Sequence, residues 1–149
     1  EGGVASGVKH TPFNALDAGY VINREAYQEY FRKMHVLFPK CKKMVMALRN
    51  QLASSHHTLT GLLYDAVHDS LYTTKIYDIQ PIVDPMGVGD AFVAGYIHAH
   101  QKRAADNQYC LDFALSASAL KNTIPGDQNL VTEEEIISNL TSSGGRIQR

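Results

Sequence analysis

Cysteine is scarce in this sequence. The two cysteines, Cys41 and Cys110, lie far apart and outside any Cys-x-x-Cys pattern. This spacing argues against a disulfide framework and against a cysteine-based metal knuckle. Unpaired thiols are typical of proteins in a reducing compartment, so we expect a cytoplasmic protein.

The sequence also lacks a large net charge and long apolar runs. The 14 basic and 15 acidic residues nearly cancel, which leaves a net charge of −1 and no excess of positive charge for nucleic acid. The apolar runs are far shorter than the ~18–20 residues that a membrane helix needs, and the first residues do not form a signal peptide. The sequence therefore predicts neither a nucleic-acid partner nor a membrane partner.

The chain has enough apolar content for one packed core. Its 149 residues are 44% hydrophobic, within the range of a single domain. The glycine-rich start, residues 1–8, is not expected to form a packed element, and the polar tail from Thr141 to Arg149 is expected to fray.

Hydrophobic periodicity and capping residues predict the order of elements. Helical spacing of apolar residues follows Asn23, and Thr132 with Glu135 forms a capping box. The expected elements are a helix over 23–38, a strand over 43–48, a hairpin of strands over 60–65 and 70–74, short strands over 75–79 and 81–83, a helix after residue 89, and helices over 107–121 and 133–140.

The segment from Ile82 to Gly95 carries the strongest functional signal. It reads Ile-Val-Asp-Pro-Met-Gly-Val-Gly-Asp-Ala-Phe-Val-Ala-Gly, and it lies where a strand-like run changes to helical spacing. Glycines at such a point let consecutive backbone N–H groups approach an anion, and the dipole of the following helix favours a phosphate there. The alternative is an ordinary turn in which Asp90 caps the first amides of the helix.

Residues 84–92 resemble the C-terminal signature of the ribokinase-like (PfkB) sugar kinases, Asp-Thr-x-Gly-Ala-Gly-Asp-Ala/Ser-Phe. Pro85 replaces the usual Thr and Val88 replaces Ala, but Asp90 and both glycines are present. The resemblance implies an α/β, three-layer ribokinase-like fold, of which this chain is the C-terminal part. In that fold a central, mostly parallel sheet is flanked by helices.

The resemblance also implies roles for the loop. Asp90 would be the catalytic base, and the N–H groups of Gly87, Val88, Gly89 and Asp90 would form the anion hole. ATP would be the phosphoryl donor, with Mg²⁺ bridging its phosphates. Some members of the family also use a potassium ion, and Asp84 with the loop near Gly126 matches the position of that site.

Two further segments are similar to the 2-keto-3-deoxygluconate kinase branch of this family. Arg49 and Asn50 follow the strand over 43–48, at a turn that borders the nucleotide in the family. The segment 119–127, which contains Asn122 and Gly126, resembles the loop that closes over adenine. The implied reaction transfers the γ-phosphoryl group of ATP to this sugar acid and gives the 6-phosphate.

Several alternatives remain open at the level of sequence. Arg49 is also compatible with an ordinary surface position. Another sugar or a nucleoside could be the substrate, because the family's sugar contacts lie mainly in an N-terminal lid half that residues 1–149 lack. A non-catalytic nucleotide-binding fragment is the third alternative. We expect these residues alone to be inactive as a kinase, and a full-length parent could be a homo-oligomer.

Overall fold

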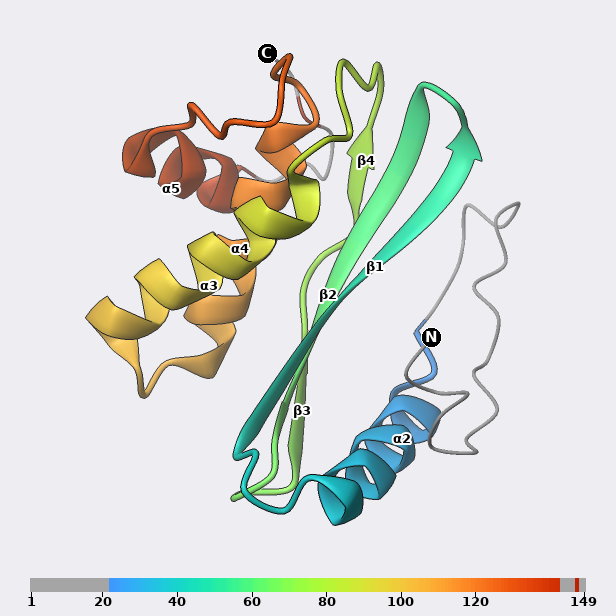
Figure 1. The fold of residues 1–149 in the computed structure, drawn as a ribbon, viewed down its shortest axis with the longest axis vertical. Helices are drawn as coiled ribbons and strands as arrows, with labels where there is room; N and C mark the ends of the chain where they lie inside the picture. The colour runs from blue at the N-terminus through green and yellow to red at the C-terminus, as the bar shows by residue number, and fades with distance from the viewer. Residues whose placement is uncertain (1–21, 143–146, 148–149) are drawn as a thin grey trace.

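A computed structural model describes residues 22–142 and 147 of the chain, so the predictions for residues 1–8 and for most of the tail lie outside the described residues. None of the described helices is long and apolar enough to cross a membrane. The elements in chain order (Figure 1) are α2 (Arg24–Leu37), β1 (Lys43–Ala53), β2 (His56–Asp65), β3 (Ser70–Thr73), β4 (Tyr77–Ile79), α3 (Val88–Arg103), α4 (Asn107–Lys121) and α5 (Glu133–Thr141).

The described strands form one antiparallel sheet. β2 pairs with β1 along one edge and with β3 and then β4 along the other. The prediction of a mostly parallel sheet is wrong for these strands, because β1 and β2 are joined by only residues 54–55, and β2 and β3 by residues 66–69. A parallel pair needs a crossover connection of about a dozen or more residues. The three-layer arrangement of the complete family fold stays a prediction.

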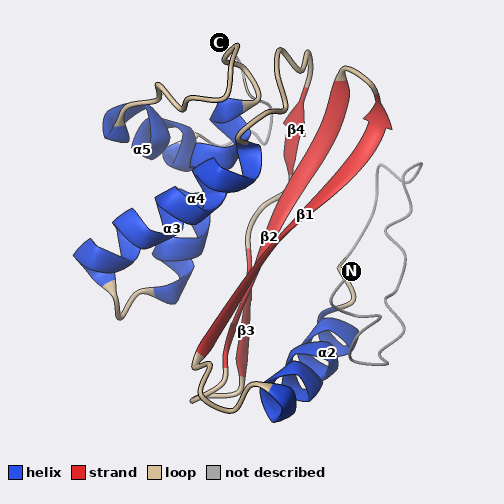
Figure 2. Cartoon of the chain, in the orientation of Figure 1, coloured by secondary structure: helices blue, strands red, loops and turns tan. Residues whose placement is uncertain are grey.

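Both faces of β2 are buried, and helices lie on both sides of the sheet (Figure 2). Side chains alternate between the faces of a strand, so Leu59 and Leu63 join the core beneath α3 and α4. Leu62 and Tyr64 join a second core with the apolar side of α2. Burial on both faces explains why Leu62, Leu63 and Tyr64 follow one another with no polar residue between them.

The predicted first helix is confirmed, and polar contacts attach it to the sheet. Asn23 caps α2 by accepting the Ala26 N–H at 3.0 Å. Arg32 donates from Nε and Nη2 to the two oxygens of Asp69, at 2.8 and 2.6 Å, in the turn between β2 and β3. The Arg32 guanidinium holds the pKa of Asp69 well below its usual range.

The helices α3 and α4 form an antiparallel hairpin that positions the site. Gly95 lies at their contact, where an added Cβ atom would meet Ala114 Cα at 3.1 Å. The hydroxyl of Ser118 in α4 donates to the Val88 carbonyl at the start of α3, at 3.0 Å. The beginning of α3 therefore lies beside the end of α4, which brings together the loops that flank them.

The remaining helices and the hairpin of β2 and β3 agree with the sequence, but several strand boundaries do not. β2 begins at His56 rather than at residue 60, and β4 begins at Tyr77 rather than at residue 75. Asp106 caps α4, and the capping box of Thr132 and Glu135 begins α5, as predicted. The strand predicted over 43–48 continues to Ala53, because pairing with β2 extends it through polar residues. The strand predicted over 81–83 is a loop, whose Ile82 N–H donates to the Ser55 carbonyl at 2.9 Å.

Candidate functional site

The predicted start of the signature helix is confirmed. Gly87 precedes α3 with φ of 72°, in the left-handed region that favours glycine. The helix's first backbone bond runs from the Ala91 N–H to the Gly87 carbonyl at 2.9 Å. The N–H groups of Val88, Gly89 and Asp90 precede that bond, so they have no partner within the helix. They point out of its positive end, where an anion is favoured.

A second loop, over residues 122–127, lies against this helix start. The Asn122 carbonyl accepts the N–H groups of Val83 and Asp84, at 2.8 and 3.2 Å. The Asn122 side chain is buried and donates to the Ser118 carbonyl at 3.0 Å. Asn122, which we predicted as a nucleotide contact, thus holds the signature loop through its backbone; a contact with nucleotide stays a prediction.

The carboxylate of Asp84 joins the two loops. Its Oδ1 accepts the Met86 N–H at 2.9 Å, and its Oδ2 accepts the Gly126 N–H at 2.8 Å, 42 residues along the chain. These two hydrogen bonds hold the pKa of Asp84 below its usual value, and the positive charge of Lys121 lowers it further. Asp84 and Gly126, both predicted site residues, are therefore in direct contact.

The two loops also touch at Gly87. A Cβ atom added there would lie 2.3 Å from the Asp127 carbonyl oxygen, far inside van der Waals contact. Glycine is thus required at this position both by its φ and by the close approach of the second loop. An added Cβ at Gly89, by contrast, meets nothing within 4 Å, so the space beside the free N–H groups is open.

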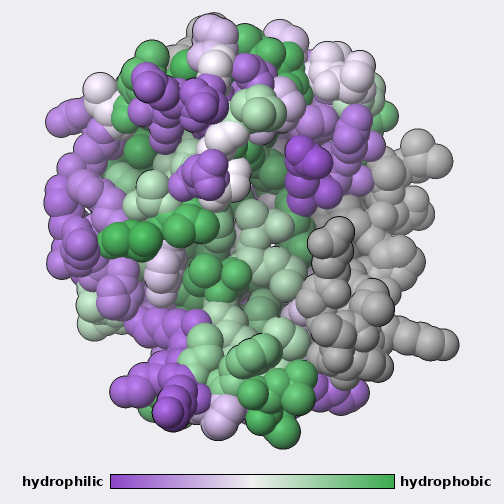
Figure 3. All heavy atoms as spheres, viewed as in Figure 1, coloured by the Kyte–Doolittle hydropathy of each residue, from purple (hydrophilic) through white to green (hydrophobic). Residues whose placement is uncertain are grey.

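Asp90 is exposed in the first turn of α3. Among the described residues, no hydrogen bond or ion pair engages its carboxylate, and the capping contact of the alternative interpretation is not formed. Val93 and Ile97, three and seven residues further on, lie on the same helix face and are 54% and 52% exposed. Apolar side chains accordingly gather over α3 in the surface view (Figure 3).

Arg49 and Asn50 lie within β1, so the prediction of a turn at these residues is wrong. Pairing with Leu59 and Thr58 of β2 holds them in the extended strand. Their side chains point to opposite faces of the sheet. Arg49 is exposed on the face that carries Leu59, whereas Asn50 is buried on the other face. Their contacts with a nucleotide stay predictions.

Sequence reasoning missed Lys121. This lysine is the last residue of α4 and is 0% exposed, with its ammonium donating to the Ile124 carbonyl at 3.1 Å. The available signal was its place at the end of an otherwise apolar helical stretch, next to the loop resembling the adenine loop.

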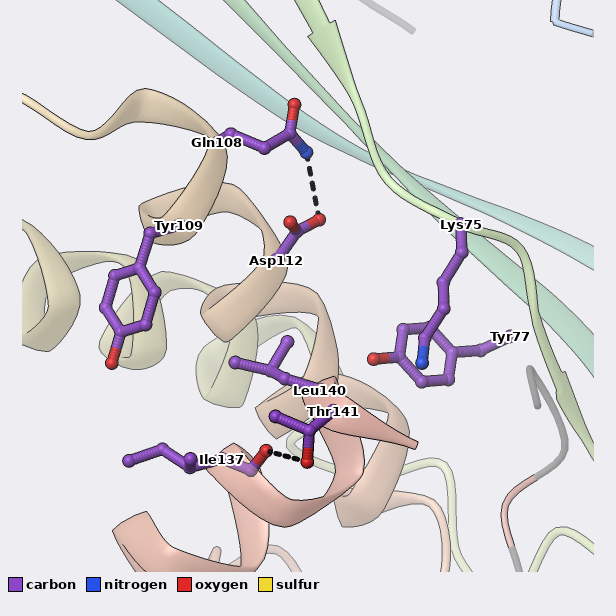
Figure 4. A pocket seen from close by; sticks show the side chains of 8 residues that line it. All are labelled: Lys75, Tyr77, Gln108, Tyr109, Asp112, Ile137, Leu140 and Thr141. Atoms are coloured by element: carbon purple, nitrogen blue, oxygen red, sulfur yellow. Dashed lines mark hydrogen bonds between the residues drawn. The ribbon is translucent and has the colours of Figure 1, made fainter. Parts of the chain in front are cut away.

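A cavity of about 480 Å³ lies elsewhere, between α4, α5 and the segment that contains Lys75 and Tyr77. Figure 4 shows Gln108 and Asp112 on its α4 wall, where the Gln108 amide donates to the Asp112 carboxylate at 3.0 Å. Burial raises the pKa of Asp112. None of the predicted site residues lines this cavity. The candidate site is therefore the open end of α3.

Comparison with known proteins supports the resemblance to the sugar kinases. No protein-family model matches the sequence, and a search of curated proteins finds no match. The structure is similar to that of 2-dehydro-3-deoxygluconokinase from Thermotoga maritima, with a TM-score of 0.73 and 28% identity over 83% of this chain. A PfkB family carbohydrate kinase from Listeria grayi matches with a TM-score of 0.71 and 27% identity over 85% of this chain.

A third solved structure, from Enterococcus faecalis, shares the fold, with a TM-score of 0.67 and 19% identity over 80% of this chain. The chain spans only 37% of the length of the Thermotoga and Listeria proteins and 34% of the Enterococcus protein. The predicted resemblance to the PfkB kinases, close to the 2-keto-3-deoxygluconate kinase branch, is confirmed.

Proposed function

We propose that this chain is the nucleotide-binding and catalytic part of an ATP-dependent carbohydrate kinase. The proposed reaction transfers the γ-phosphoryl group of ATP to a hydroxyl of 2-keto-3-deoxygluconate and gives its 6-phosphate. The similarity to the Thermotoga 2-dehydro-3-deoxygluconokinase supports the reaction class and suggests the substrate. The arrangement at the start of α3 supports the chemistry.

One observation carries the proposal: a carboxylate with no partner in the described residues lies beside N–H groups that have no partner within their helix. In phosphoryl transfer, charge spreads over the oxygens of the transferred group, and catalysis consists mainly of positioning and electrostatic stabilisation. The N–H groups of Gly87 through Asp90 would stabilise that charge. The Asp90 carboxylate would accept the proton of the attacking hydroxyl.

The residues of the helix start fit a nucleotide phosphate. The open space above Gly89 leaves room for it, and the dipole of α3 favours it. They also fit a Mg²⁺ ion that arrives with the nucleotide, since Mg²⁺ keeps several waters and commonly uses phosphate oxygens with one or two carboxylates. That ion would neutralise phosphate charge. Within the described part of the chain, no three metal-ligating side chains cluster to hold a metal by themselves.

A direct test of the function is a substrate panel with the full-length protein. ADP release is measured with ATP, Mg²⁺ and 2-keto-3-deoxygluconate, and then with fructose, ribose and a nucleoside as alternative acceptors. We expect kcat/KM to be highest for the sugar acid. Comparable or greater turnover of a neutral sugar or a nucleoside would contradict the proposed substrate, and no turnover of any acceptor would contradict the kinase.

Gly89→Val is expected to weaken ATP binding without a comparable loss of stability. The added side chain would enter the open space beside the free N–H groups and obstruct the phosphates, whereas its Cβ meets no protein atom within 4 Å. ATP affinity is measured by calorimetry and stability by thermal unfolding. Gly89→Ala, which adds a single methyl group, is the matched control and should show a smaller loss of affinity. Unchanged ATP affinity in Gly89→Val would place the phosphates elsewhere.

A further inference from the structure

The residues expected to hold a monovalent cation do not fit one. Each oxygen of the Asp84 carboxylate already accepts a backbone N–H, from Met86 and from Gly126. The nearby Asn122 carbonyl accepts two N–H groups, which uses both of its lone pairs. Pro85 offers no hydroxyl where the family pattern has threonine. The Asp84 oxygens keep one lone pair each, and the Asn122 carbonyl and Pro85 contribute none, so these residues do not by themselves surround a cation.

A protein cation binds a carbonyl of the second loop. Lys121 is fully buried, and its charge acts on the Asp84 carboxylate. Burying an ammonium group is costly unless partners compensate for the lost water. Here the compensation comes from the Ile124 carbonyl and from the end of α4, where the helix dipole favours a positive charge.

Lys121 also determines the shape of the second loop. Its side chain donates to the Ile124 carbonyl, and the Ile124 N–H donates back to the Lys121 carbonyl, both at 3.1 Å. This closed pair fixes the turn that leads to Gly126, whose N–H binds Asp84. The position of the ammonium is therefore linked, through one short turn and one carboxylate, to the loop that begins α3.

We propose that the buried ammonium of Lys121 takes the place of a monovalent cation in this site, so that nucleotide binding needs no potassium. The inference rests on the proposed function, in that the site is taken to bind ATP. It does not depend on the identity of the sugar. The ammonium and the Asp84 carboxylate together hold the two loops in the arrangement that leaves the N–H groups of α3 open.

The first test uses the full-length protein without any substitution. The affinity for a non-hydrolysable ATP analogue is measured in potassium chloride, sodium chloride and choline chloride at equal ionic strength. We expect the three dissociation constants to agree within about twofold, and the midpoints of thermal unfolding to agree as well. A saturable gain in affinity of about tenfold or more with potassium over choline would overturn the proposal.

The second test removes the ammonium. Lys121→Ala is expected to weaken binding of the analogue by about tenfold in choline chloride, with partial recovery in potassium or ethylammonium chloride, which return a cation to the vacated space. Lys75→Ala is the matched control, because Lys75 likewise donates to carbonyls at a helix end, those of Asn139 and Ser142. Its binding of the analogue should be unchanged and independent of the salt. Full affinity of Lys121→Ala in choline would contradict the proposal.

The readouts separate this inference from the proposed function. If the protein binds the analogue equally in all salts but phosphorylates no acceptor, the proposed kinase function is contradicted. The proposed role of Lys121 is then still supported. If the analogue does not bind in any salt, the unfolding midpoints decide: stabilisation by potassium over choline would contradict the proposal, and equal midpoints would support it. If Lys121→Ala does not fold, the measurements on the unsubstituted protein alone decide.

Discussion

Asp90→Asn should reduce the kcat of the full-length protein by about 10²–10⁴-fold while ATP affinity stays unchanged, because loss of a general base has an effect of this size. Asparagine has nearly the same shape as aspartate but cannot accept the hydroxyl proton. Asp90 has no hydrogen-bond partner in the described residues that the substitution would disturb, and its side chain is exposed. Steady-state kinetics with the preferred sugar, together with calorimetry for ATP, would measure both quantities.

Glu134→Gln is a suitable control for the loss of charge. Glu134 is an exposed carboxylate in the first turn of α5, so the substitution removes a negative charge from an equivalent place in another helix. Its kcat should remain at the unsubstituted level. An Asp90→Asn enzyme that retains kcat within a few-fold of normal would remove Asp90 from the catalytic role.

The second large effect is expected from Gly87→Ala, in stability and in ATP binding together. A left-handed φ costs a non-glycine residue roughly 1–2 kcal/mol, and here the new Cβ would also lie 2.3 Å from the Asp127 carbonyl oxygen. Relief of that clash requires the two loops to separate, which would stretch the hydrogen bond between Asp84 and Gly126. Denaturant unfolding should therefore show a fall in the free energy of unfolding that is well above the cost of the left-handed φ alone. ATP should also bind more weakly.

Gly126→Ala isolates the contribution of the clash. Gly126 has a similar φ of 81°, but an added Cβ there meets nothing within 4 Å. The free energy of unfolding of this variant should fall only by the roughly 1–2 kcal/mol that a left-handed φ costs a non-glycine residue. Equal destabilisation by the two substitutions would mean that the contact between Gly87 and Asp127 is not a constraint on the fold.

Arg49 and Asn50 illustrate the limit of local patterns. Polar residues after an apolar run normally indicate that a strand has ended, and the sequence placed a turn there. The strand continues because β2 offers a paired edge as far as His56. Strand formation depends on such partners more than on intrinsic preference, so a short-range pattern could not locate this boundary.

What the sequence determined by itself is local. Capping at Asn23, Asp106 and the Thr132–Glu135 box begins three helices at the predicted places, because each signal acts within one helical turn. The signature segment likewise placed glycines and Asp90 at a helix start. The antiparallel hairpin of β2 and β3 was also predicted from the sequence. The tertiary structure alone decided the pairing of β4 with β2, the bond between Asp84 and Gly126, and the burial of Lys121. These features join residues far apart in the chain or depend on surrounding elements, and such contacts leave no periodic or short-range pattern in a single sequence.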